Sequence, residues 1–285
     1  MWLWLIGLCV AVAVLCLLRS EYEKKHVVAE RFTIRSEKLE RPETTLVFLS
    51  DLHNNEFGPD NETLIRMVDA VKPDLVLVGG DMMVCKGKTG IDVPLKLLRR
   101  LAARYPVYYG NGNHETRMNE ERDIYGDQYD RYLEKLKGMG VALLDNKSVD
   151  FGGDIRVTGI DLEEPYYKKF RCGVLTRDEI AGKAGRASDE KFQILLAHSP
   201  MFFDEYRGWG ADLSLAGHFH GGTIRLPFLG GLMTPQFQFF YPWCSGMFEE
   251  DGKYLIVSRG LGTHSINIRL NDLPQLVVVT LKKGD

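Results

Sequence analysis

The sequence predicts an α/β protein in which one domain follows an apolar N-terminal segment. Five apolar runs each end in a polar or glycine cluster, and helical patterns follow the first three of them. This alternation is typical of βαβ units, which place functional residues at the carboxyl ends of strands. Two later stretches, 141–160 and 254–281, carry β-branched runs without intervening helices. They indicate antiparallel additions to the sheet or a second sheet.

The first 18 residues predict a transmembrane anchor. Residues 1–18 contain no charged side chain and no proline. A helix of this length rises about 27 Å, close to the hydrocarbon core of a bilayer, and tryptophans such as Trp2 and Trp4 suit its interface. A cleaved signal peptide is the alternative, but no Lys or Arg precedes the run and leucines close it. We therefore expect an uncleaved anchor over 1–18.

A short juxtamembrane tether, 19–25, is expected between the anchor and a single domain that spans 26–285. Arg19, Lys24 and Lys25 lie in this tether. By the positive-inside rule, basic residues on this side of the span place the domain in the cytoplasm. The prediction is a single-pass protein of the cell membrane with a cytoplasmic domain.

The remaining elements follow from the pattern of apolar residues along the chain. The segment 26–35 is short and β-branched, which predicts an edge strand that opens the domain. The polar, Ala/Gly-rich stretch 181–189 predicts an exposed loop. Amphipathic periodicity predicts helices at roughly 62–71, 92–104 and 119–137.

Composition excludes several classes of function. A net charge of −3 argues against broad binding to a nucleic-acid backbone, so no nucleic-acid partner is expected. A hydrophobic content of 45% argues against intrinsic disorder. The five cysteines form no CxxC pair, which argues against a disulfide framework and against a thiolate zinc site. Seven histidines remain as candidates for chemistry.

Five polar clusters stand at or just after the ends of predicted strands. In an extended segment, residues i and i+2 point the same way, so Asp51 with His53, and His218 with His220, should each present two ligands to one locus. The clusters supply two carboxylates, one asparagine amide and four imidazoles, enough for two ions if one carboxylate bridges. Mixed O and N ligands without thiolate suit Mn²⁺, Fe or Zn²⁺. The clusters are Asp51-Leu52-His53, Gly80-Asp81, Asn113-His114-Glu115, Ala197-His198-Ser199 and Gly217-His218-Phe219-His220.

The motifs DLH, GGDM, GNHE, AHSP and GHFHGG, in this order, resemble those of the calcineurin-like metallophosphoesterase superfamily. The runs KPDLVLVGGD and SRGLGT resemble its small membrane-anchored bacterial branch, whose members include phosphodiesterases and lipid-precursor pyrophosphatases. The resemblance covers roughly residues 44–265. It implies a four-layer αββα sandwich, two mixed β-sheets flanked by helices, with a dinuclear metal site on loops at the sheet edges.

The resemblance also implies a role for each residue and two divalent metal ions as cofactors, with Mn²⁺ preferred over Fe or Zn²⁺. The implied reaction is hydrolysis of a phosphoester or pyrophosphate bond by a metal-bridging hydroxide. His114 would face the substrate, and either donate a proton to the leaving oxygen or stabilise it as a cation. His264 has no counterpart in the pattern and is expected to be a loop residue near the cluster. The implied ligands are Asp51, His53 and His220 for the first metal, Asn113, His198 and His218 for the second, and Asp81 as the bridge.

The substrate depends on the segment 227–248, which is rich in Phe, Tyr, Trp, Met and Pro. One interpretation is a buried hairpin of the second sheet, and the other is a partly exposed apolar wall beside the site. The second interpretation, combined with an anchor, favours a lipid-linked phosphoester or pyrophosphate. Two other hypotheses are a membrane-tethered metal-binding scaffold without turnover, and a phosphodiesterase or nuclease that acts on soluble nucleotides.

Overall fold

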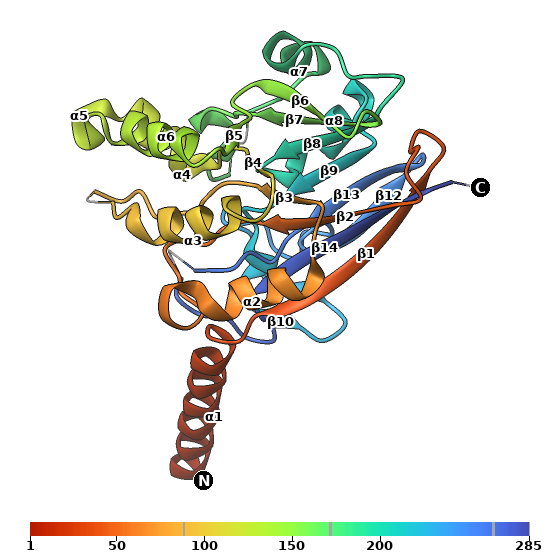
Figure 1. The fold of residues 1–285 in the computed structure, drawn as a ribbon. Helices are drawn as coiled ribbons and strands as arrows, with labels where there is room; N and C mark the ends of the chain where they lie inside the picture. The colour runs from red at the N-terminus through yellow and green to blue at the C-terminus, as the bar shows by residue number, and fades with distance from the viewer. Residues whose placement is uncertain (88, 171–172, 264–265, 285) are drawn as a thin grey trace.

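The computed structural model describes residues 1–87, 89–170, 173–263 and 266–284, and it confirms the predicted α/β architecture (Figure 1). Two six-stranded mixed sheets have the orders β1-β14-β2-β3-β4-β5 and β12-β13-β9-β8-β7-β6. The first sheet contains β1 (Val28–Ser36), β2 (Glu43–Leu49), β3 (Leu75–Val78), β4 (Val107–Tyr109), β5 (Ala142–Leu143) and β14 (Gln275–Lys283). The second contains β6 (Lys147–Phe151), β7 (Ile155–Ile160), β8 (Phe192–Ala197), β9 (Leu213–Ala216), β12 (Gly246–Glu250) and β13 (Lys253–Val257).

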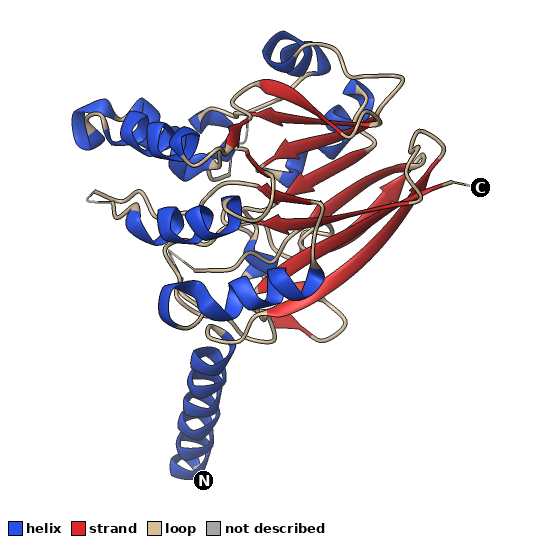
Figure 2. Ribbon diagram, viewed as in Figure 1, coloured by secondary structure: helices blue, strands red, loops and turns tan. Residues whose placement is uncertain are grey.

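Helices flank both sheets, which completes the four-layer sandwich (Figure 2). On the side of the first sheet lie α2 (Glu62–Val71), α3 (Asp92–Ala102), α4 (Asn113–Glu120), α5 (Arg122–Tyr125) and α6 (Gln128–Gly138). On the side of the second lie α7 (Arg177–Ala184) and α8 (Phe203–Trp209). Short 3₁₀ turns occupy Pro59–Asn61, Glu164–Tyr167, Pro200–Phe202 and His220–Gly222, and β10 (Arg225–Leu226) pairs with β11 (Gly230–Gly231) in a small separate sheet.

The alternation of side chains along β2 shows how the layers are held together. Val47 and Leu49 pack in the core beneath α2 and α3, whereas Leu46 and Phe48 pack in the core between the two sheets. A strand buried on both faces reads as a continuous apolar run, as LVFL does. Each such side chain contributes about 1.5–3 kcal/mol on burial, so the central strands form a rigid support for the loops that follow them.

Parallel pairing brings the polar clusters together. Strands β2, β3 and β4 run parallel to one another, as do β7, β8, β9 and β13. Their carboxyl ends therefore meet at the same edge of each sheet, where ligands bind in folds of this kind. Clusters that lie up to 170 residues apart in the sequence become neighbours in space.

Two sequence-based expectations need correction, and a third is confirmed. The helix expected over 119–137 is three short helices, because the backbone leaves the helical conformation at Glu121 and at Gly126 (φ 59°). The loop expected at 181–189 instead begins with the last turn of α7, whose N-terminus is capped by a reciprocal pair of hydrogen bonds between Thr176 and Glu179. The second sheet expected from 141–160 and 254–281 is present and contains β6, β7 and β13, while β5 and β14 join the first sheet; the pairing is parallel in some cases and antiparallel in others.

The N-terminal helix α1 (Trp2–Glu23) projects away from the body of the molecule (Figure 1). Within the described residues it is the one helix that is long and apolar enough to cross a membrane; its apolar window has a mean hydropathy of 2.3 and is 6% buried. The helix continues through residues 19–23, the segment expected to begin a tether. Its end is fixed to the domain, since Glu23 is buried and accepts hydrogen bonds from the backbone N–H groups of Asn271 and Asp272.

Candidate metal centre

Two loops that follow neighbouring strands supply the two aspartates. Asp51 follows β2 and Asp81 follows β3, and the Asp51 N–H donates to the Gly80 carbonyl oxygen over 3.0 Å. The His53 N–H donates to the Asp81 carbonyl oxygen over 3.1 Å. Gly80 has φ +84°, and a Cβ there would lie 2.0 Å from the backbone nitrogen of Gly112. Only glycine at position 80 allows the loop after β4, which contains Gly112, to approach this closely.

Five predicted ligands adopt a left-handed backbone conformation. We expected the pairs 51/53 and 218/220 to converge because alternate residues of an extended strand point the same way. Asp51 and His53 do converge on one group, but through left-handed turns, whereas His218 and His220 join different groups of ligand atoms, so that expectation was wrong for the second pair and its reason was wrong for both. Strain of this kind costs on the order of 1–3 kcal/mol per residue and is concentrated at functional sites. The residues are Asp51 (φ 54°), His53 (φ 48°), Asp81 (φ 54°), His218 (φ 67°) and His220 (φ 48°).

One group of ligand atoms gathers around Asp51. The Nε2 atoms of His53 and His220 lie 3.2 Å apart. Asp51 Oδ1 lies 3.5 Å from His220 Nε2 and 3.9 Å from His53 Nε2. These three buried side chains can hold one metal ion.

A second group gathers around Asp81, with His198 and His218. His198 Nε2 lies 3.2 Å from Asp81 Oδ2 and 3.7 Å from Asp51 Oδ1. Asp81 Oδ2 is also 3.8 Å from His53 Nε2, a member of the first group. One oxygen atom therefore lies between the two groups, as a bridging carboxylate must.

The hydrogen bonding of these atoms fits metal ions. Among the described residues, Asp81 Oδ2, Asn113 Oδ1 and His198 Nε2 are buried and have no hydrogen-bond partner. An unsatisfied buried polar group costs about 1–3 kcal/mol, so three in one place need a common explanation. All three are O or N donor atoms that bind divalent cations. The arrangement supports a dinuclear divalent metal site.

The outer nitrogen atoms of two histidines are fixed by backbone carbonyl groups. His198 Nδ1 lies 2.7 Å from the Gly79 oxygen, and His220 Nδ1 lies 3.1 Å from the Gly262 oxygen. With the proton on Nδ1, each ring turns its Nε2 lone pair toward the aspartates. Such hydrogen bonds orient metal-binding histidines and increase their basicity.

Glu115 holds the loops together, a role that the motif GNHE did not reveal. Its Oε2 accepts from the backbone N–H groups of Asp81 (2.8 Å) and Gly112 (3.0 Å), and its Oε1 accepts from that of Met82 (3.0 Å). The Tyr109 hydroxyl donates to Oε1 over 2.6 Å. This buried carboxylate therefore positions Asp81, while burial raises the pKa of Glu115 itself.

His114 lies in the first turn of α4, and a backbone N–H group orients its ring. The N–H of Cys85 donates to His114 Nδ1 over 2.8 Å, and His114 Nε2 lies 4.0 Å from Asp81 Oδ2. Burial lowers the pKa of His114, and Arg117 and Lys86 lower it further. Since Nδ1 accepts a hydrogen bond, the neutral ring carries its proton on Nε2 and presents an N–H donor to the centre.

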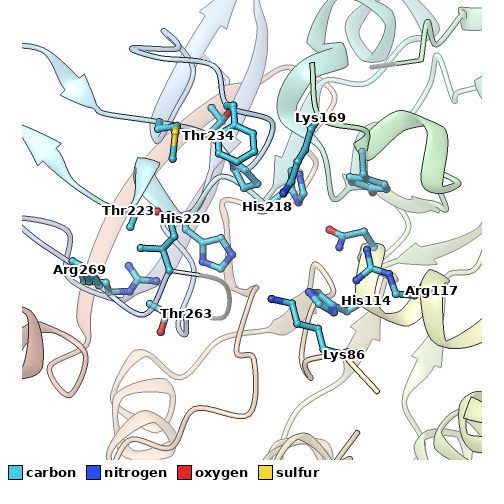
Figure 3. A pocket seen from close by; sticks show the side chains of 17 residues that line it. Lys86, His114, Arg117, Lys169, His218, His220, Thr223, Thr234, Thr263 and Arg269 are labelled. Carbon is cyan, nitrogen blue, oxygen red and sulfur yellow. The ribbon is translucent and has the colours of Figure 1, made fainter. Parts of the chain in front are cut away.

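A cavity of about 330 Å³ opens next to the metal-binding cluster (Figure 3). Lys86, Arg117 and Lys169 extend into it near His114 and His218, so the site has a local positive charge that the overall composition concealed. No motif marks these cations, because they come from three loops or helices that only the fold brings together. Apolar side chains also line the cavity, namely Met233, Pro235, Phe237, Ile266 and Ile268, together with three threonines and Arg269, and Lys169 Nζ lies 4.8 Å from the centre of the Phe237 ring.

The apolar wall decides between the two interpretations of 227–248. The segment does not form a buried hairpin of the second sheet, since β10 and β11 make a small sheet of their own. Phe237 is partly exposed and lines the cavity. The partly exposed wall is therefore the correct interpretation. His264 lies outside the described residues.

Metal binding to the metal-free protein is expected to release protons. Burial lowers the pKa of His198, but Asp81 and Asp51 outweigh this effect and raise it to about 10. A cation must displace that proton, so affinity should rise by up to about tenfold per pH unit between pH 6 and 8. Titration calorimetry in buffers of different protonation enthalpy measures the protons released. Mn²⁺ affinity that is independent of pH over this range would contradict the prediction.

Comparisons with known proteins agree with this site. A family model described as calcineurin-like phosphoesterase matches residues 44–222. The metallophosphoesterase YkuE of Bacillus subtilis is 29% identical over 253 residues, which cover 83% of this chain and 78% of YkuE. The phosphodiesterase YaeI of Escherichia coli is 28% identical over 244 residues (83% and 81%). The UDP-2,3-diacylglucosamine pyrophosphatase LpxG of Chlamydia trachomatis is 25% identical over 271 residues (76% and 77%).

Proposed function

Because the chain belongs to the calcineurin-like phosphoesterase family and is a hydrolase of phosphoester bonds, we propose that its natural substrate is a lipid-linked phosphoester or pyrophosphate. The observation that carries this proposal is the cavity, whose lining combines candidate metal ligands and cations with a group of apolar side chains. An amphiphilic phosphate ester has the same two parts. The relative LpxG, a pyrophosphatase of a diacylglucosamine nucleotide, supports this substrate class.

We divide the proposed ligands between two ions, following the groups around Asp51 and around Asp81; a third group of atoms, from His53, Asp81 and His114, overlaps both. When bound, two divalent ions would activate water and stabilise negative charge on the phosphoryl oxygens. Mn²⁺ is the proposed metal, because the donor set mixes carboxylate, amide and imidazole without thiolate. We assign Asp51, His53 and His220 to one ion, Asn113, His198 and His218 to the other, and Asp81 to both.

His114 is the proposed catalytic residue. Its Nε2–H is aimed at the centre, and its pKa is lowered, so it acts as a neutral hydrogen-bond donor to an oxygen of the reacting phosphate. The structure does not favour the cationic form that the resemblance allowed, because Nδ1 already accepts the Cys85 N–H. This donor stabilises charge as it develops on the leaving oxygen.

The three cations favour a substrate with more than one negative charge. Lys86 and Arg117 approach the centre on the side of His114, and Lys169 approaches it from the side of His218 (Figure 3). A second phosphate or a terminal phosphate between them would gain charge-assisted hydrogen bonds in a partly buried site.

We propose that α1 anchors the protein in the membrane with the catalytic domain on the cytoplasmic side. Its length and its mean hydropathy of 2.3 suit a single span, and Arg19, Lys24 and Lys25 follow the span. Residues 1–18 would lie in the bilayer, and 26–285 would form the metallophosphoesterase domain. An anchor confines the cavity to the plane in which an amphiphilic substrate is concentrated.

Turnover of a micellar lipid pyrophosphate should exceed that of a soluble aryl phosphodiester. The test compares Met233→Ala, which trims the cavity wall, with Met247→Ala, a methionine on β12 outside the wall. Met233→Ala should raise KM for the lipid about tenfold, the effect expected for losing one buried apolar side chain, and leave the soluble ester unaffected. A preference for the soluble ester that neither detergent nor Met233→Ala changes would refute a lipid-linked substrate.

A further inference from the structure

We propose that the β10–β11 hairpin is a second membrane contact, which inserts its apolar tip into the lipid interface beside α1. The proposal rests on the membrane anchor proposed above and concerns a different part of the chain. The hairpin tip consists of Phe228 and Leu229 between the two short strands. Figure 1 shows β10 at the edge of the body from which α1 emerges, near the level where the helix ends.

The hairpin exposes apolar side chains that a water-facing loop has no reason to carry. Phe228 is fully exposed and Leu229 is 62% exposed. The following loop adds Phe239, which is 63% exposed, and Phe240, which is 47% exposed. Large neighbouring apolar groups on a protein surface mark an interaction site, and aromatic rings are favoured at the membrane interface.

Hydrogen bonds connect the hairpin to residues 269–272, and the same segment also holds the end of α1. On one side of this segment, Arg269 N–H donates to Ser20 Oγ and Asn271 N–H donates to Glu23. On the other side, Arg225 N–H of β10 donates to the Leu270 oxygen, and Leu270 N–H donates to the Thr223 oxygen. Helix and hairpin are therefore held in one orientation, and a bilayer that contains α1 lies against the hairpin tip.

The cavity opens between these two membrane-facing elements. Met233 and Phe237 approach it from the chain that continues the hairpin, and Ile266 and Ile268 approach it from the segment that holds α1. Ile266 is itself 45% exposed. With the tip inserted, the apolar side chains that line this part of the cavity would lie close to the lipid. The hairpin would thus deliver the substrate as well as hold the domain.

Photocrosslinking tests the contact without requiring turnover. The full-length chain, with benzoylphenylalanine in place of Phe228, is reconstituted into phosphatidylcholine–phosphatidylglycerol vesicles and irradiated. Lipid adducts on this peptide, found by mass spectrometry, are the expected result. The control places the same group at Ile124, an exposed apolar residue of α5 on a part of the body remote from α1 (Figure 1). It should give no lipid adduct.

Two outcomes would overturn the proposal: equal lipid adducts at both positions, or adducts at position 228 with a second copy of the chain. A kinetic comparison adds an independent measurement. Phe228→Asp combined with Leu229→Asp should raise KM for a vesicle-embedded lipid pyrophosphate about tenfold and leave a soluble aryl phosphate unaffected, whereas Ile124→Asp should change neither. Lipid adducts without hydrolysis of any lipid would refute the proposed substrate but not the membrane contact.

Discussion

Replacing Asp81 with alanine should remove metal from the centre and reduce kcat by about 10³-fold or more. Asp81 Oδ2 lies within 3.8 Å of both His198 Nε2 and His53 Nε2, which belong to different ligand groups. As the proposed bridge, this oxygen would contribute to both ions, and two ions supply several kcal/mol of transition-state stabilisation. Elemental analysis of purified protein gives the metal content, and a phosphate ester assay gives kcat.

Two further variants test whether the loss of metal is caused by removing the Asp81 carboxylate. Asp81→Asn removes the charge of the side chain. It keeps an oxygen that can accept from the backbone N–H of His114, as Asp81 Oδ1 does over 2.8 Å. We expect it to lose at least one metal ion. Asp154→Ala removes another buried carboxylate, one that accepts the Glu40 N–H far from the cluster, and should keep the full metal content. Unchanged metal content in Asp81→Ala would refute the bridging assignment.

Replacing His114 with alanine should reduce kcat by about 10²–10⁴-fold, the usual contribution of a positioned proton or hydrogen-bond donor, while metal is retained. The imidazole is oriented by the Cys85 N–H and, in the proposed role, would present its Nε2–H to the reacting group. Its metal-binding neighbours keep their own supports, among them the carbonyl groups of Gly79 and Gly262. Steady-state kinetics and metal analysis on the same preparation separate the two effects.

The pH dependence distinguishes a neutral donor from a cation. Burial lowers the pKa of His114 below its ordinary value of 6.5, so the ring is neutral at pH 7. Activity that depended on a cationic ring would fall as pH rises from 6 to 8, whereas activity with a neutral donor should not. His26→Ala, at an exposed histidine that stacks on Tyr22, is the matched control and should leave kcat unchanged. Loss of metal in His114→Ala would show that His114 is a ligand.

The sequence predicted the central elements well because their apolar runs are long and regular. The predicted 62–71 helix coincides with α2, and the strand predicted at 26–35 is the edge strand β1. The segment at 119–137 was predicted wrongly as one helix, because the backbone breaks at Glu121 and Gly126, and α4 and α6 on either side of the breaks pack against each other. Local periodicity does not record such tertiary constraints.

The sequence by itself determined the α/β class, the apolar N-terminal segment and the set of candidate ligands, because motif spacing and hydrophobic patterning are local properties. Only the tertiary structure decided which atoms meet. Left-handed turns at positions 51, 53, 81, 218 and 220 aim the ligands, and Glu115 fixes the loop of Asp81. The cationic rim and the apolar wall of the cavity also depend on the fold, because their residues come from separate loops that no sequence pattern connects. Residue types define what a site can bind, but long-range packing sets the distances at which binding occurs.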